Sequence, residues 1–248
     1  MTDQRKGAVI VTGASRGIGA AIAEKLAGDG YGVIVNYAAD ADGAESVVSA
    51  IRAKGGRAEA VRADVASDDD VTAMFGRAQQ QMGPLTALVN NAGTFGEVRR
   101  VDEREADELT RLMQVNVVGP MLCAKHAVQA MSTAHGGHGG CIVNIASIAA
   151  QAPAWAMGAV PYEATKGALV TFARGLSNEV AAEGIRVNSV SPGIIDTEMA
   201  YPVAQEAAEH SPLGRIGRPD EIADAVSWLV SPEASFVTGS DIAVSGGL

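Results

Sequence analysis

Residues 8–19 read AVIVTGASRGIG, a short apolar run that leads into three glycines, Gly13, Gly17 and Gly19. An apolar run that ends in a glycine turn and continues into a helical pattern predicts a buried strand, a tight loop and a helix. The glycines would let the chain turn tightly, let a pyrophosphate approach the backbone and let the helix pack on the strand. Free N–H groups at the start of the helix would bind that anion, although ordinary strand-to-helix turns carry the same pattern. The residues expected at this candidate dinucleotide site are Gly13, Ser15, Arg16, Gly17, Ile18 and Gly19.

The same alternation of short apolar runs and amphipathic stretches continues along the chain. Runs that are apolar at every position suit strands covered on both faces, and helical crossovers between them make the sheet parallel. The sequence therefore predicts an α/β fold, a doubly wound sandwich with helices on both faces of a seven-stranded sheet. The expected strands are Ala8–Thr12, Gly32–Asn36, Ala58–Arg62, Ala87–Asn90, Cys141–Ala146, Arg186–Val190 and Ile242–Val244.

The composition indicates one domain without polyanionic partners. A chain of 248 residues, 47% of them hydrophobic, can bury a full core, so we expect residues 1–248 to form a single domain. The formal net charge of -10 disfavours binding to nucleic acid and to membrane surfaces. No apolar run approaches the roughly 20 residues that span a bilayer, and the N-terminus reads as a strand rather than an export signal. Two isolated thiols, Cys123 and Cys141, suit core positions in a cytoplasmic protein.

The end of the second expected strand bears on the choice of dinucleotide. A carboxylate at this place would bind the 2′-hydroxyl of NAD(H) and repel a 2′-phosphate. The sequence has Asn36 and Tyr37 there, followed by two alanines. Arg16 could bind a 2′-phosphate with two hydrogen bonds, which favours NADP(H) over NAD(H). Asp40 lies just beyond, no second cation follows this strand, and Arg16 could also be a solvated surface cation.

Tyr162 and Lys166 are four residues apart at the start of a helical pattern, hence on one face of the helix. A phenol with a pKa near ~10 is a poor acid at neutral pH, so an adjacent ammonium would lower its pKa and allow proton exchange with a carbonyl oxygen. Ser147 follows the fifth expected strand, at the sheet edge where ligands bind, and its hydroxyl could hold the same oxygen. Taken singly, this Tyr–Lys spacing is often accidental, and a serine after a strand is usually a cap.

Taken together and in order, the motifs resemble those of the short-chain dehydrogenase/reductase family along nearly the whole chain. They are TGASRGIG at 12–19, Asn90-Asn91-Ala92-Gly93, Asn116, Ser147, Tyr162 with Lys166, and Ser191-Pro192-Gly193. The resemblance is nearest to the 3-oxoacyl-acyl-carrier-protein reductase and glucose dehydrogenase-like branch. It implies a single-domain Rossmann fold with strand order 3-2-1-4-5-6-7. It also implies hydride transfer between NADP(H) and a carbonyl or alcohol substrate: a ketone, a 3-oxoacyl thioester or a sugar.

The resemblance assigns roles to individual residues. It implies a catalytic tetrad of Asn116, Ser147, Tyr162 and Lys166, in which Asn116 holds a water that links Lys166 to solvent. Tyr162 and Lys166 also belong to the cofactor site, because Lys166 would bind the nicotinamide ribose. The other contacts that it implies are with the adenine (Asp64, Val65), the adenosine ribose (Asn90, Ala92, Gly93) and the nicotinamide (Pro192, Gly193, Ile195, Thr197). Thr197 could instead cap a helix.

Two features depart from the family pattern. Ser245 stands where the family often has aspartate, and the segment between Ser147 and Tyr162 is longer than is common. In the family this segment lines the substrate side, so we expect a modified pocket there and a mobile lid over residues 198–213. The residues expected to select the substrate are Thr94, Phe95, Ala149, Gln151 and Trp155.

No metal is expected. His135, His138 and Cys141 lie close together but lack a fourth ligand, and the acidic run 68–70 is typical of a helix N-terminus.

Two other functions stay open beside the enzyme. A regulator that binds NADP(H) without catalysis would keep the fold, but it would not need Ser147, Tyr162 and Lys166. An interaction scaffold would rest on oligomerisation. Relatives pair through the helices that here fall at 101–131 and 162–182, usually as tetramers, so we expect a homo-oligomer, tetrameric or dimeric.

Overall fold

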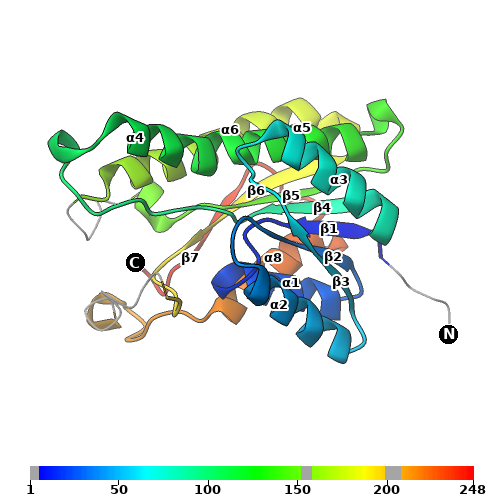
Figure 1. Cartoon of the computed structure of the whole chain (residues 1–248), viewed down its shortest axis with the longest axis horizontal. Helices are drawn as coiled ribbons and strands as arrows, with labels where there is room; N and C mark the ends of the chain where they lie inside the picture. The colour runs from blue at the N-terminus through cyan, green and yellow to red at the C-terminus, as the bar shows by residue number, and fades with distance from the viewer. Residues whose placement is uncertain (1–5, 152–157, 199–207) are drawn as a thin grey trace.

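A seven-stranded parallel sheet forms the middle layer of the protein, with strand order β3-β2-β1-β4-β5-β6-β7 (Figure 1). This computed structural model describes residues 6–151, 158–198 and 208–248. The strands are β1 (Ala8–Val11), β2 (Gly32–Tyr37), β3 (Arg57–Arg62), β4 (Leu85–Asn90), β5 (Gly140–Ile145), β6 (Ile185–Pro192) and β7 (Asp241–Val244). The predicted class, strand number and strand order are confirmed.

Helices cover both faces of the sheet. Helices α1 (Gly17–Gly28), α2 (Ala41–Ala53) and α8 (Pro219–Val230) lie on one face (Figure 1). The other face carries α3 (Asp68–Met82), α4 (Ala106–Met113), α5 (Gly119–Met131) and α6 (Val160–Val180). A π-helical turn, η2 (Gln114–Val118), joins α4 to α5. The short 3-10 helices are η1 (Val101–Glu103), η3 (Thr133–His135), η4 (Ile148–Ala150), η5 (Ala181–Glu183) and η6 (Pro232–Ala234).

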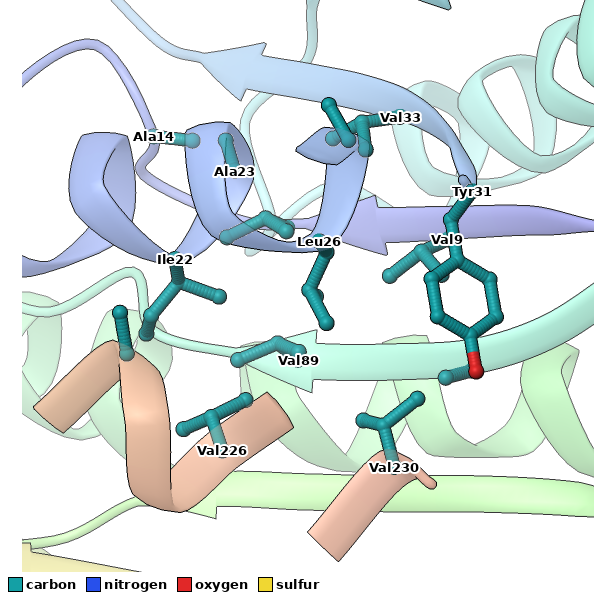
Figure 2. Packing of buried hydrophobic residues seen from close by; sticks show 14 of the residues in the cluster. Val9, Ala14, Ile22, Ala23, Leu26, Tyr31, Val33, Val89, Val226 and Val230 are labelled. Carbon is teal, nitrogen blue, oxygen red and sulfur yellow. The ribbon is translucent and has the colours of Figure 1, made fainter. Parts of the chain in front are cut away.

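The central strand β1 shows how the sequence pattern produces two cores. All four of its residues are fully buried, and because side chains alternate along a strand they serve both faces. Val9 and Val11 pack in the cluster under α1, α2 and α8, part of which Figure 2 shows with Ile22 and Leu26 of α1. Ile10 packs in the cluster under α3, α5 and α6. Burial on both faces explains why the strand is apolar at every position.

Strand ends differ from the prediction by one or two residues, most clearly at the end of β6. The predicted strand stopped at Val190, but β6 continues because Ser191 and Pro192 pair with Ala243 and Val244 of β7. Ser191 carries no apolar signal, so the pairing partner decides this boundary.

The predictions for the acidic run and for the two cysteines are confirmed. The acidic run 68–70 forms the first turn of α3, where the Ser67 hydroxyl caps the Asp70 N–H. Cys123 and Cys141 are free and buried, one in each hydrophobic cluster. None of the helices in the described part of the chain has the length and apolarity needed to cross a lipid bilayer.

Candidate active site

A cavity of about 770 Å³ opens at the carboxyl ends of the strands. In a doubly wound sheet this edge holds the ligand, because successive loops diverge where the strand order reverses, here between β1 and β4. Segments that follow six strands line the cavity: Gly13–Gly19 in part, Asn36–Asp40, Ala63–Val65, Asn91–Gly93, Ile145–Ala149 and, at the end of β6, Pro192–Glu198.

The glycine loop is held against the neighbouring strands. Gly13 has a φ of +61°, which favours glycine, and its N–H donates to Asn36 Oδ1 at 3.1 Å. A Cβ on Gly19 would stand 2.5 Å from Asn91 Nδ2 and from the Gly13 carbonyl oxygen. Asn91 in turn donates to the Thr12 and Gly13 carbonyl oxygens, both at 2.9 Å. The loop can close on β2 and β4 only because side chains are missing at these positions.

The start of α1 fits a diphosphate. No side chain caps its first turn, no acidic residue lies there, and Gly17 and Ile18 line the cavity. The first N–H groups of a helix have no partner within it, and the helix dipole makes this end positive. A Cβ on Gly17 would lie 3.3 Å from Thr197 Cγ2, so the loop also approaches the segment after β6 closely. These donors, together with the cationic Arg16, match the anionic part of a dinucleotide.

Arg16 lies between two carboxylates at the end of the cavity that the sequence predicts to hold the adenosine ribose, which is called the ribose end below. Its guanidinium is 3.7 Å from Asp40 Oδ2 and 3.6 Å from Glu198 Oε2, and its side chain is 67% exposed. The sequence indicated a free cation here, but neither of these contacts was expected. Exposed ion pairs of this kind are weak, so both carboxylates can yield Arg16 to a stronger anion.

Asp64, predicted at the adenine, already has two donors. Its Oδ1 accepts from the Ala66 N–H at 3.0 Å, and its Oδ2 accepts from Arg111 at 2.8 Å. Partial burial raises the pKa of Asp64, but the hydrogen bonds from Ala66 and Arg111 outweigh this and lower it below its usual value. A carboxylate has about four acceptor positions, so room remains for an adenine amine. Arg111 lines the cavity from α4, and sequence reasoning missed it.

Ser147, Tyr162 and Lys166 meet at the other end of the cavity. Ser147 lies two residues after the end of β5, and its hydroxyl accepts from the Ala149 N–H at 3.2 Å. The half-buried Tyr162 ring packs on Phe95, with centroids 4.6 Å apart. Lys166 Nζ lies 5.6 Å from the Tyr162 ring centroid, on the same face of α6 as predicted. The three side chains thus line the same part of the cavity.

The pKa values of this group differ from the expectation. Burial of the phenol raises the pKa of Tyr162 to about 12, and the neighbouring Ser147 hydroxyl offsets only part of that rise. Burial also lowers the pKa of Lys166 to about 8. The predicted lowering of the Tyr162 pKa by Lys166 is therefore wrong for the net shift, because desolvation dominates and the group that opposes it is the Ser147 hydroxyl.

Asn116 does not line the cavity; it is buried next to it and hydrogen-bonded to neighbouring segments. It is 1% exposed and lies in the π-helical turn η2. Its Nδ2 donates to the Thr94 carbonyl oxygen at 2.8 Å and to Thr165 Oγ1 at 3.1 Å, while its Oδ1 accepts from the Thr94 N–H at 2.9 Å. A Cβ on Gly93 would lie 3.4 Å from Asn116 Oδ1 and 3.6 Å from Lys166 Nζ. Gly93 therefore lies next to both Asn116 and Lys166, and the water relay stays a prediction.

Asp241 joins two segments of the site that are far apart in the sequence. Its Oδ1 accepts from Ser191 Oγ at 2.7 Å, and its Oδ2 accepts from Gln151 Nε2 at 2.5 Å. Gln151 ends the short helix that begins after Ser147, and Ser191 precedes the turn at Pro192. Gln151, predicted to select the substrate, is not a lining residue of the cavity, and its side chain is bound to Asp241 instead.

Most of the predicted site residues line this one cavity. Those that do are Gly13, Ser15, Arg16, Gly17, Ile18, Gly19, Asn36, Tyr37, Asp64, Val65, Ala92, Gly93, Ser147, Tyr162, Lys166, Pro192, Gly193, Ile195 and Thr197. Asn116 and Asn90 do not. Asn90 ends β4 with its side chain buried, where it donates to Asn144 Oδ1 at 2.9 Å and to the Pro120 carbonyl oxygen at 3.2 Å.

Other substrate-side predictions have mixed outcomes. Phe95 and Ala149 line the cavity, whereas Thr94 is bound to Asn116. Trp155 and residues 199–207 of the expected lid lie outside the described residues. Glu163 was missed. It lines the cavity beside Tyr162, and its buried Oε1 has no hydrogen-bond partner in the described part of the chain.

Known proteins resemble this chain over almost its whole length. A family profile described as enoyl-(acyl carrier protein) reductase matches residues 13–248. An uncharacterized oxidoreductase of Escherichia coli K12, YgfF, is 42% identical, covering 96% of this chain and 98% of that protein. Glucose 1-dehydrogenase 2 of Bacillus subtilis is 37% identical, covering 96% of this chain and 93% of that protein. The 3-oxoacyl-[acyl-carrier-protein] reductase FabG of Staphylococcus aureus is 38% identical, covering 96% of each.

Solved structures share the fold. A blue fluorescent protein from a metagenomic library, in complex with NADPH, is 36% identical with a TM-score of 0.90, covering 99% of both chains. A short chain dehydrogenase from Burkholderia cenocepacia J2315, in complex with NADP, is 35% identical with a TM-score of 0.90 and covers 98% of this chain and 97% of that one.

Proposed function

Because this chain belongs to the short-chain dehydrogenase/reductase family of oxidoreductases, we propose that it reduces a carbonyl compound with NADPH. The observation that carries the proposal is the presence of Ser147, Tyr162 and Lys166 in the wall of the same cavity as the glycine loop. A proton donor group and a dinucleotide-binding loop in one cavity are what a hydride-transfer enzyme needs. Bound NADPH would supply the hydride.

The preference for NADP(H) over NAD(H) rests on charge at the ribose end. No acid follows directly on β2, where Ala38 and Ala39 line the cavity, and Arg16 lies beside them. Two of the solved relatives were determined with NADPH or NADP. Asp64 and Val65 would hold the adenine, and Lys166 would hold the nicotinamide ribose.

The pKa order of the site residues supports a path for the proton. Ser147 and Tyr162 would hold the substrate oxygen, and Tyr162 would donate its proton as negative charge develops there. The resulting tyrosinate, whose phenol has a pKa of about 12, is a stronger base than Lys166, whose pKa is about 8. Lys166 would therefore return a proton to Tyr162, and each transfer would run downhill.

The pKa of Tyr162 also suits the reductive step, in which the phenol is the proton donor. An alkoxide is about as basic as hydroxide, whose conjugate acid, water, has a pKa of about 15.7. A phenol with a pKa of about 12 is a stronger acid than water, so Tyr162 protonates the alkoxide readily. In the oxidative direction Tyr162 would have to act as a tyrosinate, which a pKa of about 12 makes scarce at neutral pH.

The lining of the substrate side favours an apolar neighbour for the reacting carbonyl. Phe95 packs on the Tyr162 ring, and Ile148, Ala149 and Ala159 also line the cavity, as does the acidic residue Glu163. Such a lining suits a ketone or a 3-oxoacyl thioester better than a sugar, whose hydroxyls would lose hydrogen bonds to water. Two relatives are named for 3-oxoacyl-acyl-carrier-protein and glucose substrates.

The test combines cofactor binding with turnover. Purified protein is titrated with NADPH and NADH and then assayed for NADPH oxidation with ketones, 3-oxoacyl thioesters and sugars. The control is Tyr162→Phe, which keeps the ring against Phe95 and removes the proton. We expect turnover with at least one ketone or thioester, and a loss of at least about 100-fold in kcat for Tyr162→Phe at unchanged NADPH affinity. NADPH binding without turnover on the whole panel would overturn the proposal.

We further propose a cytoplasmic homo-oligomer, most simply a tetramer. Met113, Val118 and Met121 are 45%, 42% and 38% exposed, and they lie in the segment 101–131 through which pairing was predicted. Exposed apolar side chains gathered in one segment are typical of subunit interfaces. Light scattering coupled to gel filtration measures the mass directly, and Met121→Glu should lower it.

A further inference from the structure

We infer that Arg62 is a second cation for the 2′-phosphate of NADPH, an assignment that rests on the proposed function. The sequence shows no second cation after β2. The sheet supplies one from the neighbouring strand, because β3 pairs with β2 in a register that sets Arg62 opposite Tyr37. Arg62 thus ends its strand beside the loop in which Ala38 and Ala39 line the cavity.

One hydrogen bond fixes the guanidinium at this loop. Arg62 Nε donates to the Ala38 carbonyl oxygen at 3.3 Å. A guanidinium has five N–H donors in a rigid plane, and the four on the two Nη atoms have no hydrogen-bond partner in the described part of the chain. Two parallel N–H groups of this kind match the oxygens of a phosphate.

Arg62 also differs from Arg16 in its ionic contacts. Arg16 has both Asp40 and Glu198 within 3.7 Å, so this cluster has one positive charge against two negative charges. A 2′-phosphate would have to compete with both carboxylates for Arg16. Arg62 is exposed and forms no ion pair with any described residue, and it adds a positive charge beside the Ala38 carbonyl oxygen, two residues before Asp40. The ribose end accepts a 2′-phosphate more readily when both arginines contribute.

The test compares binding of NADPH and NADH, followed by the fluorescence change of the reduced cofactor. We expect Arg62→Gln to raise the Kd of NADPH about 10-fold, which corresponds to the loss of one charge-assisted hydrogen bond at an exposed site. The Kd of NADH, which has no 2′-phosphate, should rise by less than about twofold. The Kd of NADPH for Arg62→Lys should lie between those of the natural protein and Arg62→Gln. The ammonium keeps the positive charge but lacks the paired N–H donors of the guanidinium. The same variants are titrated with 2′,5′-ADP and with 5′-AMP, which differ only in the 2′-phosphate and lack the nicotinamide.

Arg57→Gln is the matched control. Arg57 lies at the opposite end of β3 and also donates to a backbone carbonyl, that of Lys6 at 3.0 Å. It should leave both Kd values unchanged. If Arg62→Gln weakens the binding of NADPH and of NADH equally, Arg62 only holds the Ala38 loop in place, and the inference is overturned. An unchanged NADPH affinity overturns it as well.

This experiment separates the inference from the proposed function. If NADPH binding depends on Arg62 and no carbonyl compound is reduced, the reductase proposal fails and the assignment of Arg62 stands. If carbonyl reduction occurs and NADPH binding is independent of Arg62, the assignment alone fails.

Discussion

Lys166 Nζ donates a hydrogen bond to the Ile145 carbonyl oxygen at 2.8 Å, so the buried ammonium of α6 is tied to the last residue of β5. Ser147 follows two residues later on the same strand end. This single bond therefore sets the distance between the helix that carries Tyr162 and the turn that carries Ser147. It also holds a charge where little water reaches it, and that position has a measurable consequence for stability.

Stability should rise with pH between about 8 and 10 because of Lys166. Its folded-state pKa of about 8 is below the ordinary 10.5, so the unfolded chain binds more protons than the folded chain in this window. Raising the pH therefore disfavours the unfolded state. Lys166→Met should remove a rise of about 2 kcal/mol in the free energy of unfolding over this window. Tyr162 opposes the trend only above pH 10, where its ordinary ionisation begins.

Urea unfolding of both proteins at several pH values measures the effect. Lys125→Met, which removes an exposed ammonium paired with Asp68, is the control. Equal slopes for the natural protein and Lys166→Met would contradict the prediction.

Gly19→Ala should abolish dinucleotide binding and destabilise the protein. Its Cβ would stand 2.5 Å from Asn91 Nδ2 and from the Gly13 carbonyl oxygen, too close for either to remain in place. Overpacking of this kind costs about 1–3 kcal/mol. Gly28→Ala in the same helix is the control, since a Cβ there meets nothing within 4 Å. Thermal unfolding and NADPH titration check both, and equal behaviour of the two variants would refute the steric argument.

Asp241→Ala should lower kcat about tenfold while leaving the Kd of NADPH unchanged, because catalysis is sensitive to small displacements of the reacting groups. Asp241 holds Gln151 and Ser191, which flank the turn after Ser147 and the turn at Pro192. Asp220→Ala serves as the control, because its carboxylate lies exposed in the first turn of α8 and pairs with Arg218 just before that helix. A loss of thermal stability at unchanged kcat would show that Asp241 is structural only.

The two thiols should not react with disulfide reagents in the folded protein. Burial raises the pKa of Cys123 to about 12 and that of Cys141 to about 11, so thiolate is scarce and access is blocked. Both should react once the chain is unfolded in guanidinium. A fast-reacting thiol in the native protein would show that one of the two hydrophobic clusters opens.

The parts of the site that sequence could predict are those encoded within a few residues. The glycine loop, the Tyr162–Lys166 spacing and the strands apolar at every position all depend on local geometry. The parts that were missed depend on pairing between distant segments. Arg62 reaches Ala38 only through the register of β2 and β3, which no local pattern contains.

Asn90 and Tyr162 show two further limits. Asn90 was placed at the cofactor because its motif follows a strand, but alternation along β4 turns its side chain away from the cavity toward Asn144. The pKa of Tyr162 was expected to fall because only the charge of Lys166 could be read from the spacing. Desolvation depends on the packed surroundings, and it reverses the shift.

The strand order has a consequence for how the chain acquires its structure during synthesis. β1 pairs with β4, whose first paired residue is Leu85 against Ala8, so the central pair cannot form until about a third of the chain has left the ribosome. The Pro192 edge of the site follows only with β6. Pairings between such distant segments slow folding, and until they form the apolar strands stay exposed to aggregation. A truncated chain that ends before Ile185 should therefore be aggregation-prone and unable to bind a dinucleotide.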